Sequence, residues 1–338
     1  MRLENNKNLS AMNTFGMKVS CAAFLEYDTI EDLFKIDFEN LPKPVLHMGG
    51  GSNLLFTRDF PGTVVHSCIR YIRTAGDDGD EVLVEAGAGV VFDDFVDWAC
   101  EMGYWGAENL SLIPGEVGAS AVQNIGAYGV EAKDIIVRVN CFDTVKRDLV
   151  VFENADCRYG YRSSFFKEDE AKGRYIVTAV LFRLTREYSP KLEYGNIRAV
   201  LDGTDIDLPG DVRNAIIGIR KAKLPDPAEI GSAGSFFKNP IISREHFERI
   251  CAEAGEGVKV PHFDTAEGVK VPAAWMIERC GFKGKTLGGA AVYEKQPLVI
   301  VNLSGSATPE EVIGLETEII DAVKARFGVE LHPEVEHI

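Results

Sequence analysis

The sequence contains no long hydrophobic run, no closely paired cysteines and comparatively little positive charge. No apolar stretch approaches 18 consecutive residues, and the amino-terminal segment lacks the apolar run of a signal peptide. The seven cysteines form no CxxC pair, so neither a zinc site nor a disulfide framework is indicated. These absences predict no membrane segment, no bound metal and a reduced, cytoplasmic setting.

The shortage of positive charge is the most unusual of these features. The chain has 36 Lys and Arg residues against 52 Asp and Glu residues, a formal net charge of −16. Nucleic acids and anionic membranes require clustered cations, so the composition argues against both as partners. A phosphorylated ligand would have to be held by backbone N–H groups and a few local cations. Any such site should therefore be locally positive within an acidic protein.

The length of 338 residues, with 46% hydrophobic and 26% charged residues, allows two or three globular domains. Apolar strands are expected at residues 44–48, 63–67, 82–87, 135–144 and 175–184. A helix is expected at residues 92–102, with Met102 on its apolar face. Residues 185–223 are polar and rich in turn formers, as is typical of a connection between domains. Beyond this connection we expect a helix at 272–280, a β-rich stretch at 290–303 and a final helix with Thr308 as N-cap, a capping-box Glu311 and Gly328 at its end.

Two glycine-rich segments are the first candidates for a ligand site. Gly49-Gly50-Gly51-Ser52-Asn53 follows a strand, and such a run can turn successive N–H groups toward an anion. It fits neither the Rossmann pattern nor the P-loop, and a simple tight turn would also explain it. The second segment, 113–129, is dense in small residues that let a backbone loop approach a flat ligand, although a packed core loop is the alternative.

Arg162 is enclosed by aromatic residues, with Tyr161 before it and two phenylalanines shortly after it. Partial removal from water would strengthen the hold of its guanidinium on a carboxylate or an enolate. Stacking of the arginine on a tyrosine at the surface is the alternative.

Ser235 stands between Gly234 and Phe236, which would present its hydroxyl in a fixed direction. No nucleophile elbow surrounds it and no histidine lies nearby in the sequence, so a proton donor is favoured over an acylating serine. A turn or N-cap serine is the alternative. In the tail, Pro333 stiffens the chain before Glu334, and Val335 and Ile338 could anchor it so that Glu334 points inward.

Together these motifs resemble the UDP-N-acetylenolpyruvoylglucosamine reductase family over nearly the whole chain, from about residue 13 to the end. The resemblance rests on six motifs in the family's order: GGGSN, IPGxVGAxxxQNIGAYG, YRxS, KLPDP, GSAGSFFKNP and a terminal PEV. It implies an α+β fold with a two-lobed flavin-binding portion like that of vanillyl-alcohol-oxidase-type proteins (a PCMH-type FAD-binding fold) and a smaller carboxyl-terminal α+β substrate domain. The implied limits are 1–68 and 69–222 for the two lobes and 223–328 for the substrate domain, with the tail 329–338 returning to the active site.

The resemblance also implies a set of functional residues. FAD would bind noncovalently, NADPH would be the co-substrate, and a monomer acting on UDP-N-acetylglucosamine enolpyruvate is expected. The implied catalytic residues are Arg162, Ser235 and Glu334. The implied substrate contacts are Tyr128, Tyr161, Tyr194, Lys223 and Asn239, with Tyr194 typical of the family's longer subtype. The implied cofactor contacts are Gly49, Gly50, Gly51, Ser52, Asn53, Leu54, Ile113, Pro114, Gly115, Gly118, Ala119, Ser120, Gln123, Asn124, Ile125, Gly126 and Ala127.

By this resemblance the reaction reduces the enolpyruvyl group to a D-lactyl ether, giving UDP-N-acetylmuramate for peptidoglycan. Arg162 would stabilise the enolate, Ser235 would supply the proton, and Glu334 would be protonated or part of a proton relay. Glu116 departs from the family pattern, as does Ala121. Because a carboxylate close to a pyrophosphate is repulsive, Glu116 should point away or form a hydrogen bond elsewhere. Another flavin-dependent sugar or alcohol oxidoreductase, and a noncatalytic nucleotide-sugar binding protein, are the alternatives.

Overall fold

The computed structural model describes residues 1–338, which form two compact units. The first unit contains residues 1–8, 20–51 and 60–222, and the second contains residues 9–19, 52–59 and 223–338. Helices and strands occur in both units, which confirms the expected α+β class. The division at residue 68 and the limits of a substrate domain stay predictions. None of the helices has the length and apolar character needed to cross a membrane.

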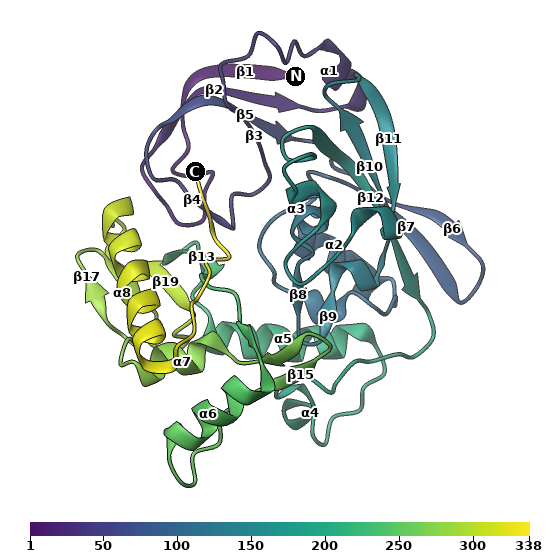
Figure 1. The fold of residues 1–338 in the computed structure, drawn as a ribbon. Coiled ribbons are helices and arrows are strands. Elements are labelled where there is room, and N and C mark those ends of the chain that lie inside the picture. Colours follow the sequence, from purple (N-terminus) through teal and green to yellow (C-terminus); the bar gives the residue numbers. More distant parts are fainter. The chain divides into compact units, whose positions relative to one another are not determined.

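The first sheet of the first unit joins strands from distant parts of the chain in the order β1-β2-β5-β3 (Figure 1). β1 is antiparallel to β2, whereas β2, β5 and β3 run parallel. The bounds are Arg2–Asn8 for β1, Ser20–Tyr27 for β2, Phe60–Ser67 for β5 and Val45–Met48 for β3. Helix α1 (Ile30–Lys35) places Leu33 in a small core with residues of these strands. The strands expected at 44–48 and 63–67 are confirmed.

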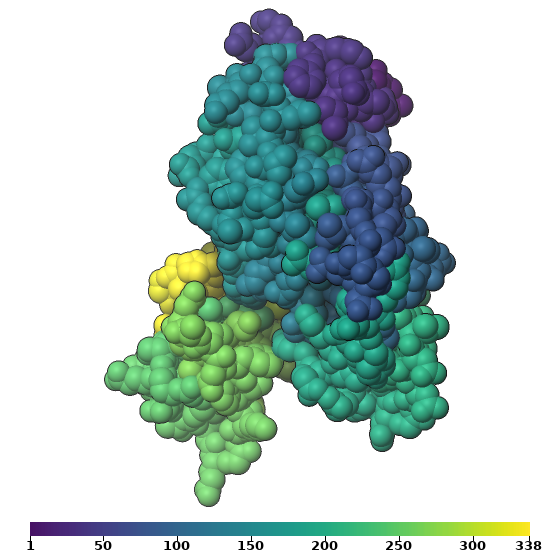
Figure 2. Space-filling view, turned by 90° about the vertical axis from the view of Figure 1, so that its right-hand side faces the viewer, coloured from purple at the N-terminus to yellow at the C-terminus, as the bar shows by residue number.

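The second sheet of this unit is antiparallel throughout and has the order β11-β10-β12-β7-β6. Its central strand β12 carries an almost continuous run of buried residues, whereas β6 lies at the surface (Figure 2). The bounds are Asp148–Glu153 for β11, Ile136–Asp143 for β10, Tyr175–Thr185 for β12, Glu81–Gly87 for β7 and Ile72–Asp77 for β6. The strands expected at 82–87, 135–144 and 175–184 are therefore confirmed.

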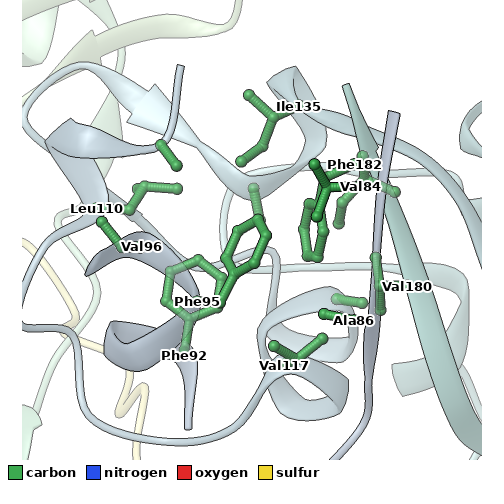
Figure 3. Close-up of a cluster of buried hydrophobic side chains, with 14 of the residues drawn as sticks. Val84, Ala86, Phe92, Phe95, Val96, Leu110, Val117, Ile135, Val180 and Phe182 are labelled. Carbon is green, nitrogen blue, oxygen red and sulfur yellow. The ribbon is translucent and has the colours of Figure 1, made fainter. Parts of the chain in front are cut away.

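Helix α2 (Phe92–Glu101) packs on this sheet through one apolar face. Phe95 stacks on Phe182 of β12 with ring centroids 4.3 Å apart, in a core that also contains Phe92 and Val96 (Figure 3). Burial of two such rings is worth several kcal/mol, before the entropy cost of ordering them. The helix expected at 92–102 is confirmed, but Met102 was expected on the same face and is 50% exposed, because the helix has ended before it.

The expectation of a turn-rich connection over residues 185–223 is wrong for its second half. Helix α5 spans Pro209–Lys223, and a short helix α4 spans Ile197–Val200. Val212, Ile216 and Ile219 recur at helical spacing and are buried in a core of their own. The polar residues between them dilute the pattern in the sequence. The carboxylate of Asp211 accepts hydrogen bonds from the N–H groups of Asp207 and Leu208, which fixes the entry into α5.

The second unit is built on the antiparallel sheet β13-β19-β18-β17. The segment 9–19 reaches this sheet, where the Thr14 carbonyl accepts a hydrogen bond of 2.9 Å from Ser232 N–H. The strand bounds are Gly231–Ser235 for β13, Val299–Asn302 for β19, Ala290–Val292 for β18 and Thr286–Leu287 for β17. A smaller sheet has the order β14-β16-β15, with bounds Ile241–Ile242, Gly268–Lys270 and Phe263–Thr265. The β-rich stretch expected at 290–303 is confirmed.

Three helices belong to the second unit: α6 (Arg244–Ala254), α7 (Ala273–Arg279) and α8 (Pro309–Phe327). The start of α8 has the predicted capping box, since Thr308 Oγ1 accepts from Glu311 N–H and the Glu311 carboxylate accepts from Thr308 N–H. Gly328 ends the helix at φ +65°, a left-handed conformation that glycine adopts without strain. The helices expected at 272–280 and after residue 308 are confirmed.

The ion pair of the buried Asp143 with the partly exposed Arg174 gives the first unit a testable pH dependence. Asp143 is 1% exposed, and Arg174 Nη2 donates to its Oδ2 at 2.7 Å. This hydrogen bond and the N–H groups of Val145 and Lys146 lower the pKa of Asp143. We expect Asp143→Asn to reduce the free energy of unfolding at pH 7 by about 3 kcal/mol.

The difference between wild type and Asp143→Asn should shrink with acid. Because the folded pKa is below the unfolded value near 4, the stabilisation is complete above about pH 4 and is lost as the pH falls through the folded pKa. Urea unfolding at a series of pH values measures this, with the exposed Asp148→Asn as control. A difference that stays constant down to pH 2 would contradict this account of the pair.

Candidate active site

The two glycine-rich segments meet in the first unit. A Cβ added to Gly50 would lie 3.4 Å from Gly115 Cα, and one added to Gly49 would lie 3.3 Å from Ala119 Cβ. The two stretches of chain therefore pass each other almost backbone to backbone, and side chains at these glycines would fill the space. Gly51 has φ +61°, which turns the chain at the end of the run. Such a cradle suits the close approach of a dinucleotide backbone.

The expectation that residues 113–129 form one loop is wrong, because Val117–Gln123 is a helix, α3. Small residues disguise it in the sequence, and the same small residues let it lie directly on the chain that follows β7. Gly118 N–H donates to Ala88 O at 3.0 Å, and a Cβ on Gly118 would come within 2.9 Å of Ala88 Cβ. Val117 N–H donates to Val90 O in the same way. These two amides hold the helix in place, so they are not available to a phosphate.

The polar side chains around the end of α3 brace the fold. Asn124 is fully buried at φ +44°, donates through its amide to Gly160 O at 2.8 Å and accepts from Lys133 N–H at 3.0 Å. Gln123 Oε1 accepts from Lys167 Nζ at 2.7 Å. Ser120 Oγ donates to a backbone carbonyl of its own helix. The side chains of Asn124, Gln123 and Ser120 are thus all engaged within the protein.

Arg162 is oriented by the chain that leaves α3. Its Nη2 donates to Gly126 O at 2.6 Å, its Nη1 donates to Asn124 O at 3.4 Å, and its guanidinium carbon lies 5.5 Å from the centre of the Tyr161 ring. Arg162 itself has φ +52°, a conformation that a non-glycine residue adopts only under constraint. Two main-chain carbonyls thus orient the guanidinium.

Two further tyrosines expected to contact substrate lie in this part of the first unit. A Cβ on Gly129 would lie 3.2 Å from Tyr194 Cβ, so Tyr194 packs on the chain directly after Tyr128. Burial raises the pKa of Tyr194, and the positive charge of Arg162 acts in the opposite direction. The structure therefore brings Tyr194 and Arg162 within electrostatic range of each other.

The sequence interpretation missed Arg220, which lies at the same site. Its Nη2 donates to Leu112 O at 3.2 Å, and its Nε is buried without a hydrogen-bond partner. Burial lowers the pKa of Arg220, while Tyr128 acts to raise it. Arg220 stands four residues after Ile216 on the buried face of α5, so recognition of that helix would have pointed to it.

Left-handed residues concentrate at this site. Seven non-glycine residues have positive φ, and four of them lie in the segments discussed here: Leu112, Asn124, Tyr128 and Arg162. Each such conformation costs about 1 kcal/mol or more and persists only where its surroundings enforce it. This clustering supports the assignment of these segments to function.

In the second unit, Ser235 ends β13 at an irregularity of the sheet. The register with β19 shifts between Ser232 and Ser235, and Gly234 has φ +72°. Phe236 N–H donates to Leu298 O at 2.7 Å, and its ring is fully buried. The bulge, the glycine and the buried phenylalanine constrain the backbone on both sides of Ser235, and the direction of its hydroxyl stays a prediction.

The tail lies beside this serine. Glu334 N–H donates to Phe236 O at 2.8 Å, and Asn53 Nδ2 donates to Glu334 O at 3.1 Å. β20 (Glu336–His337) then pairs in parallel with β4 (Leu54–Leu55). Val335 is 3% exposed, which confirms it as an anchor of the tail. The second unit thus brings Asn53, Ser235 and Glu334 together.

Three further residues singled out in the sequence are Lys223, Asn239 and Glu116. Lys223 is exposed at the end of α5, and Asn239 Oδ1 accepts from Ala273 N–H at 2.9 Å, at the start of α7. Glu116 is buried, with Oε1 2.9 Å from His66 Nε2. The expectation that Glu116 forms its hydrogen bond elsewhere is therefore confirmed.

Comparisons with known proteins define the class first. A model of the FAD binding domain matches residues 37–145. The glycine cradle contributes to this matched region, and the chain is a flavoprotein oxidoreductase with FAD as its cofactor. A second model, described as UDP-N-acetylenolpyruvoylglucosamine reductase, C-terminal domain, matches residues 226–338.

Near full-length relatives then define the family. The chain is 48% identical to a UDP-N-acetylenolpyruvoylglucosamine reductase of Bacteroides fragilis, over 99% of this chain and 100% of the relative. It is 47% identical to one of Chromobacterium violaceum, over 97% and 96% of the two chains. The chain belongs to the UDP-N-acetylenolpyruvoylglucosamine reductase family.

A solved structure confirms the fold class. The reductase of this name from Thermus caldophilus superposes with a TM-score of 0.70 over 100% of this chain and 99% of that one, at 23% identity. The expected flavin-binding fold with a carboxyl-terminal α+β domain is therefore confirmed.

The contact between Gly118 and Ala88 gives a prediction for cofactor binding. In Gly118→Ala the added methyl carbon would lie 2.9 Å from Ala88 Cβ, which is too close for two carbon atoms, so α3 must shift away from Ala88. We expect a loss of about 1–3 kcal/mol in stability and at least a tenfold weaker retention of FAD. Thermal unfolding and flavin release on dialysis measure the two effects.

Gly218→Ala in α5 is the matched control. Nothing lies within 4 Å of the added methyl group there, and alanine favours a helix by about 0.5–1 kcal/mol over glycine. This variant should keep FAD as wild type does. Equal flavin retention by the two variants would mean that the contact does not position the cofactor segment.

Proposed function

We propose that this chain uses NADPH to reduce UDP-N-acetylglucosamine enolpyruvate to UDP-N-acetylmuramate, a step of peptidoglycan precursor synthesis in the cytoplasm. The names of near full-length relatives support this reaction. The structural observation that carries the proposal is the hydrogen bond from Glu334 N–H to Phe236 O, which holds a tail carboxyl group beside the Ser235 bulge. An oxidase or a binding protein on this fold gives that arrangement no role.

FAD fits the residues of the first unit, since a side chain at Gly49 or Gly50 would fill the space beside Ala119 and Gly115. Bound noncovalently there, FAD supplies hydride transfer, from NADPH to the terminal vinyl carbon of the enolpyruvyl group. The chain's part is to hold it, through the backbone of Gly49–Leu54 and of the segment from Ile113 to Ala127. Gly118 acts indirectly, by holding α3.

Arg162 stabilises the charge that develops on the substrate. Addition of hydride to the vinyl carbon leaves negative charge on the neighbouring carbon and its carboxylate, as an enolate. A fixed guanidinium aimed at that oxygen lowers the energy of the transition state more than that of the ground state. The two carbonyls that hold Arg162 keep it oriented before the reaction, so little reorganisation is needed.

Ser235 supplies the proton that completes the reduction. Its hydroxyl transfers a proton to the enolate carbon, which gives the D-lactyl ether. Glu334 cannot help as a bare anion, because it would repel the enolate. We therefore assign it either the neutral, protonated form as a hydrogen-bond donor or the role of returning a proton to the serine.

Binding of the UDP-sugar falls to Tyr128, Tyr161, Tyr194, Lys223 and Asn239, to which we add Arg220. The phenols offer hydrogen bonds and ring faces, and the two cations offset the acidic surface near the phosphates. Arg220 lies against Tyr128, so a change at either residue should affect substrate affinity more than flavin content.

The visible spectrum tests the function directly. Under anaerobic conditions NADPH should bleach the flavin band, and UDP-N-acetylglucosamine enolpyruvate should then restore it. Bleaching of the flavin band by a sugar alcohol in place of NADPH, followed by its restoration with oxygen, would identify an oxidase instead. A colourless protein that cannot be reconstituted with FAD would favour a binding protein.

Substitution of Glu334 tests its protonation. If a neutral donor suffices, Glu334→Gln should keep at least about tenfold more kcat than Glu334→Ala, out of a total loss of about 10²–10⁴. Glu330→Gln, at an exposed glutamate of the same tail, is the control and should leave kcat unchanged. Equal collapse of the Gln and Ala variants would exclude the neutral-donor role.

A further inference from the structure

A cluster of metal-ligand side chains lies in the first unit, on the sheet of β2 and β5. These strands run parallel, and their register sets Glu26 directly opposite His66. Cys68 is two residues after His66, so its side chain is on the same face of the extended chain. Glu26, His66 and Cys68 each present one ligand atom, and these atoms all lie within 4.8 Å of one another.

The geometry points to a site for one Zn²⁺ ion, and we propose that Glu26, His66 and Cys68 bind it with water as the fourth ligand. The proposal is independent of the reductase chemistry. The sequence predicted no metal, because the ligands come from two strands 40 residues apart and show no motif spacing.

The distances fit a tetrahedral ion closely. His66 Nδ1 lies 3.5 Å from Glu26 Oε1 and 4.0 Å from Cys68 Sγ. With zinc bonds of about 2.0–2.3 Å, donors at tetrahedral angles are about 3.3–3.6 Å apart. The distance between Glu26 and His66 already lies in this range, whereas Cys68 Sγ must move about 0.4–0.7 Å toward His66 Nδ1. All three ligand atoms lie within 4.8 Å of one another, and rotation of the partly exposed Cys68 and Glu26 side chains can bring them closer.

The other nitrogen of the same imidazole is already oriented as metal ligands usually are. His66 Nε2 lies 2.9 Å from Glu116 Oε1, and both side chains are less than 10% exposed. Zinc-bound histidines commonly give their second N–H to a carboxylate, which fixes the ring and makes the free nitrogen more basic. Glu116 would play this part, with His66 Nδ1 directed at the metal.

The set of donor atoms selects the kind of metal. A thiolate and an imidazole favour zinc over Mg²⁺ or Ca²⁺, which prefer oxygen ligands. The outer oxygen of Glu26 is paired with Arg2, so one carboxylate oxygen remains to face the histidine. Thiolate, carboxylate and Zn²⁺ together carry no net charge, which removes the cost of an isolated ion.

Binding at this site should be felt at the glycine cradle. Glu116 Oε2 would lie 3.2 Å from a Cβ on Gly49, so the carboxylate that orients His66 also packs on the glycine run. A metal that fixes His66 would fix Glu116 and, through it, the position of Gly49. It should therefore raise the melting temperature of the flavin-loaded protein.

The proposal is tested on the chelator-treated, flavin-loaded protein with Zn²⁺ and Co²⁺ as probes. We expect one Zn²⁺ per chain by calorimetry, and binding at least tenfold weaker in Cys68→Ser and in Glu26→Gln. Bound Co²⁺ should give a thiolate charge-transfer band, together with d–d bands at longer wavelength than the flavin. Both should disappear in Cys68→Ser.

Cys251→Ser is the matched control, because Cys251 is another partly exposed thiol, on α6 of the second unit. It should bind Zn²⁺ and show the Co²⁺ spectrum as wild type does. Circular dichroism of each variant checks that its fold is retained. Absence of saturable Zn²⁺ binding in wild type, or an unchanged Co²⁺ spectrum in Cys68→Ser, would overturn the proposal and leave His66 as a polar contact between Glu26 and Glu116.

Discussion

The first unit depends on the contact of Gly118 with Ala88, which holds a short helix against the end of β7. Because α3 lies so close to Ala88, Gly115 and Ala119 can pass Gly50 and Gly49 almost backbone to backbone. Its end at the buried Asn124 then sends the chain through Gly126, whose carbonyl holds Arg162. The lack of a side chain at Gly118 therefore allows both the position of the cofactor segment and the orientation of Arg162, the cation that we assign to catalysis.

The net charge of −16 describes the surface and says little about the site. Several arginines away from the candidate site are paired with carboxylates, as Arg174 is with Asp143. Arg162 and Arg220 also donate to main-chain carbonyls, which orient their guanidinium groups. An acidic protein can thus bind anionic ligands, since N–H groups and a few cations oriented in this way suffice locally.

The sequence predicted most of the regular elements and missed two helices, each for its own reason. The cap signals of α8 and the apolar face of α2 are local, so both helices could be recognised. Helix α3 was missed because small residues carry no hydrophobic pattern, although their smallness is what its packing requires. Helix α5 was missed because polar residues interrupt its row of apolar residues. Arg220 lies on this helix and was therefore missed as well.

Composition and residue spacing could not predict which distant segments of the chain pair with each other. The parallel pairing of β2 and β5 creates the group of Glu26, His66 and Cys68, and only the register of that sheet reveals it. The pairing of β20 with β4 likewise joins the tail to residues 54–55 within the second unit. The order of motifs pointed to the family without explaining how such residues meet.

The central claim is that Ser235 protonates the substrate and has no part in taking hydride from NADPH. Rapid mixing of Ser235→Ala separates the two half-reactions. The account predicts flavin reduction by NADPH at nearly the wild-type rate and reoxidation by UDP-N-acetylglucosamine enolpyruvate slowed by about 10²–10⁴. Reoxidation at the wild-type rate, or an equal slowing of both half-reactions, would contradict it.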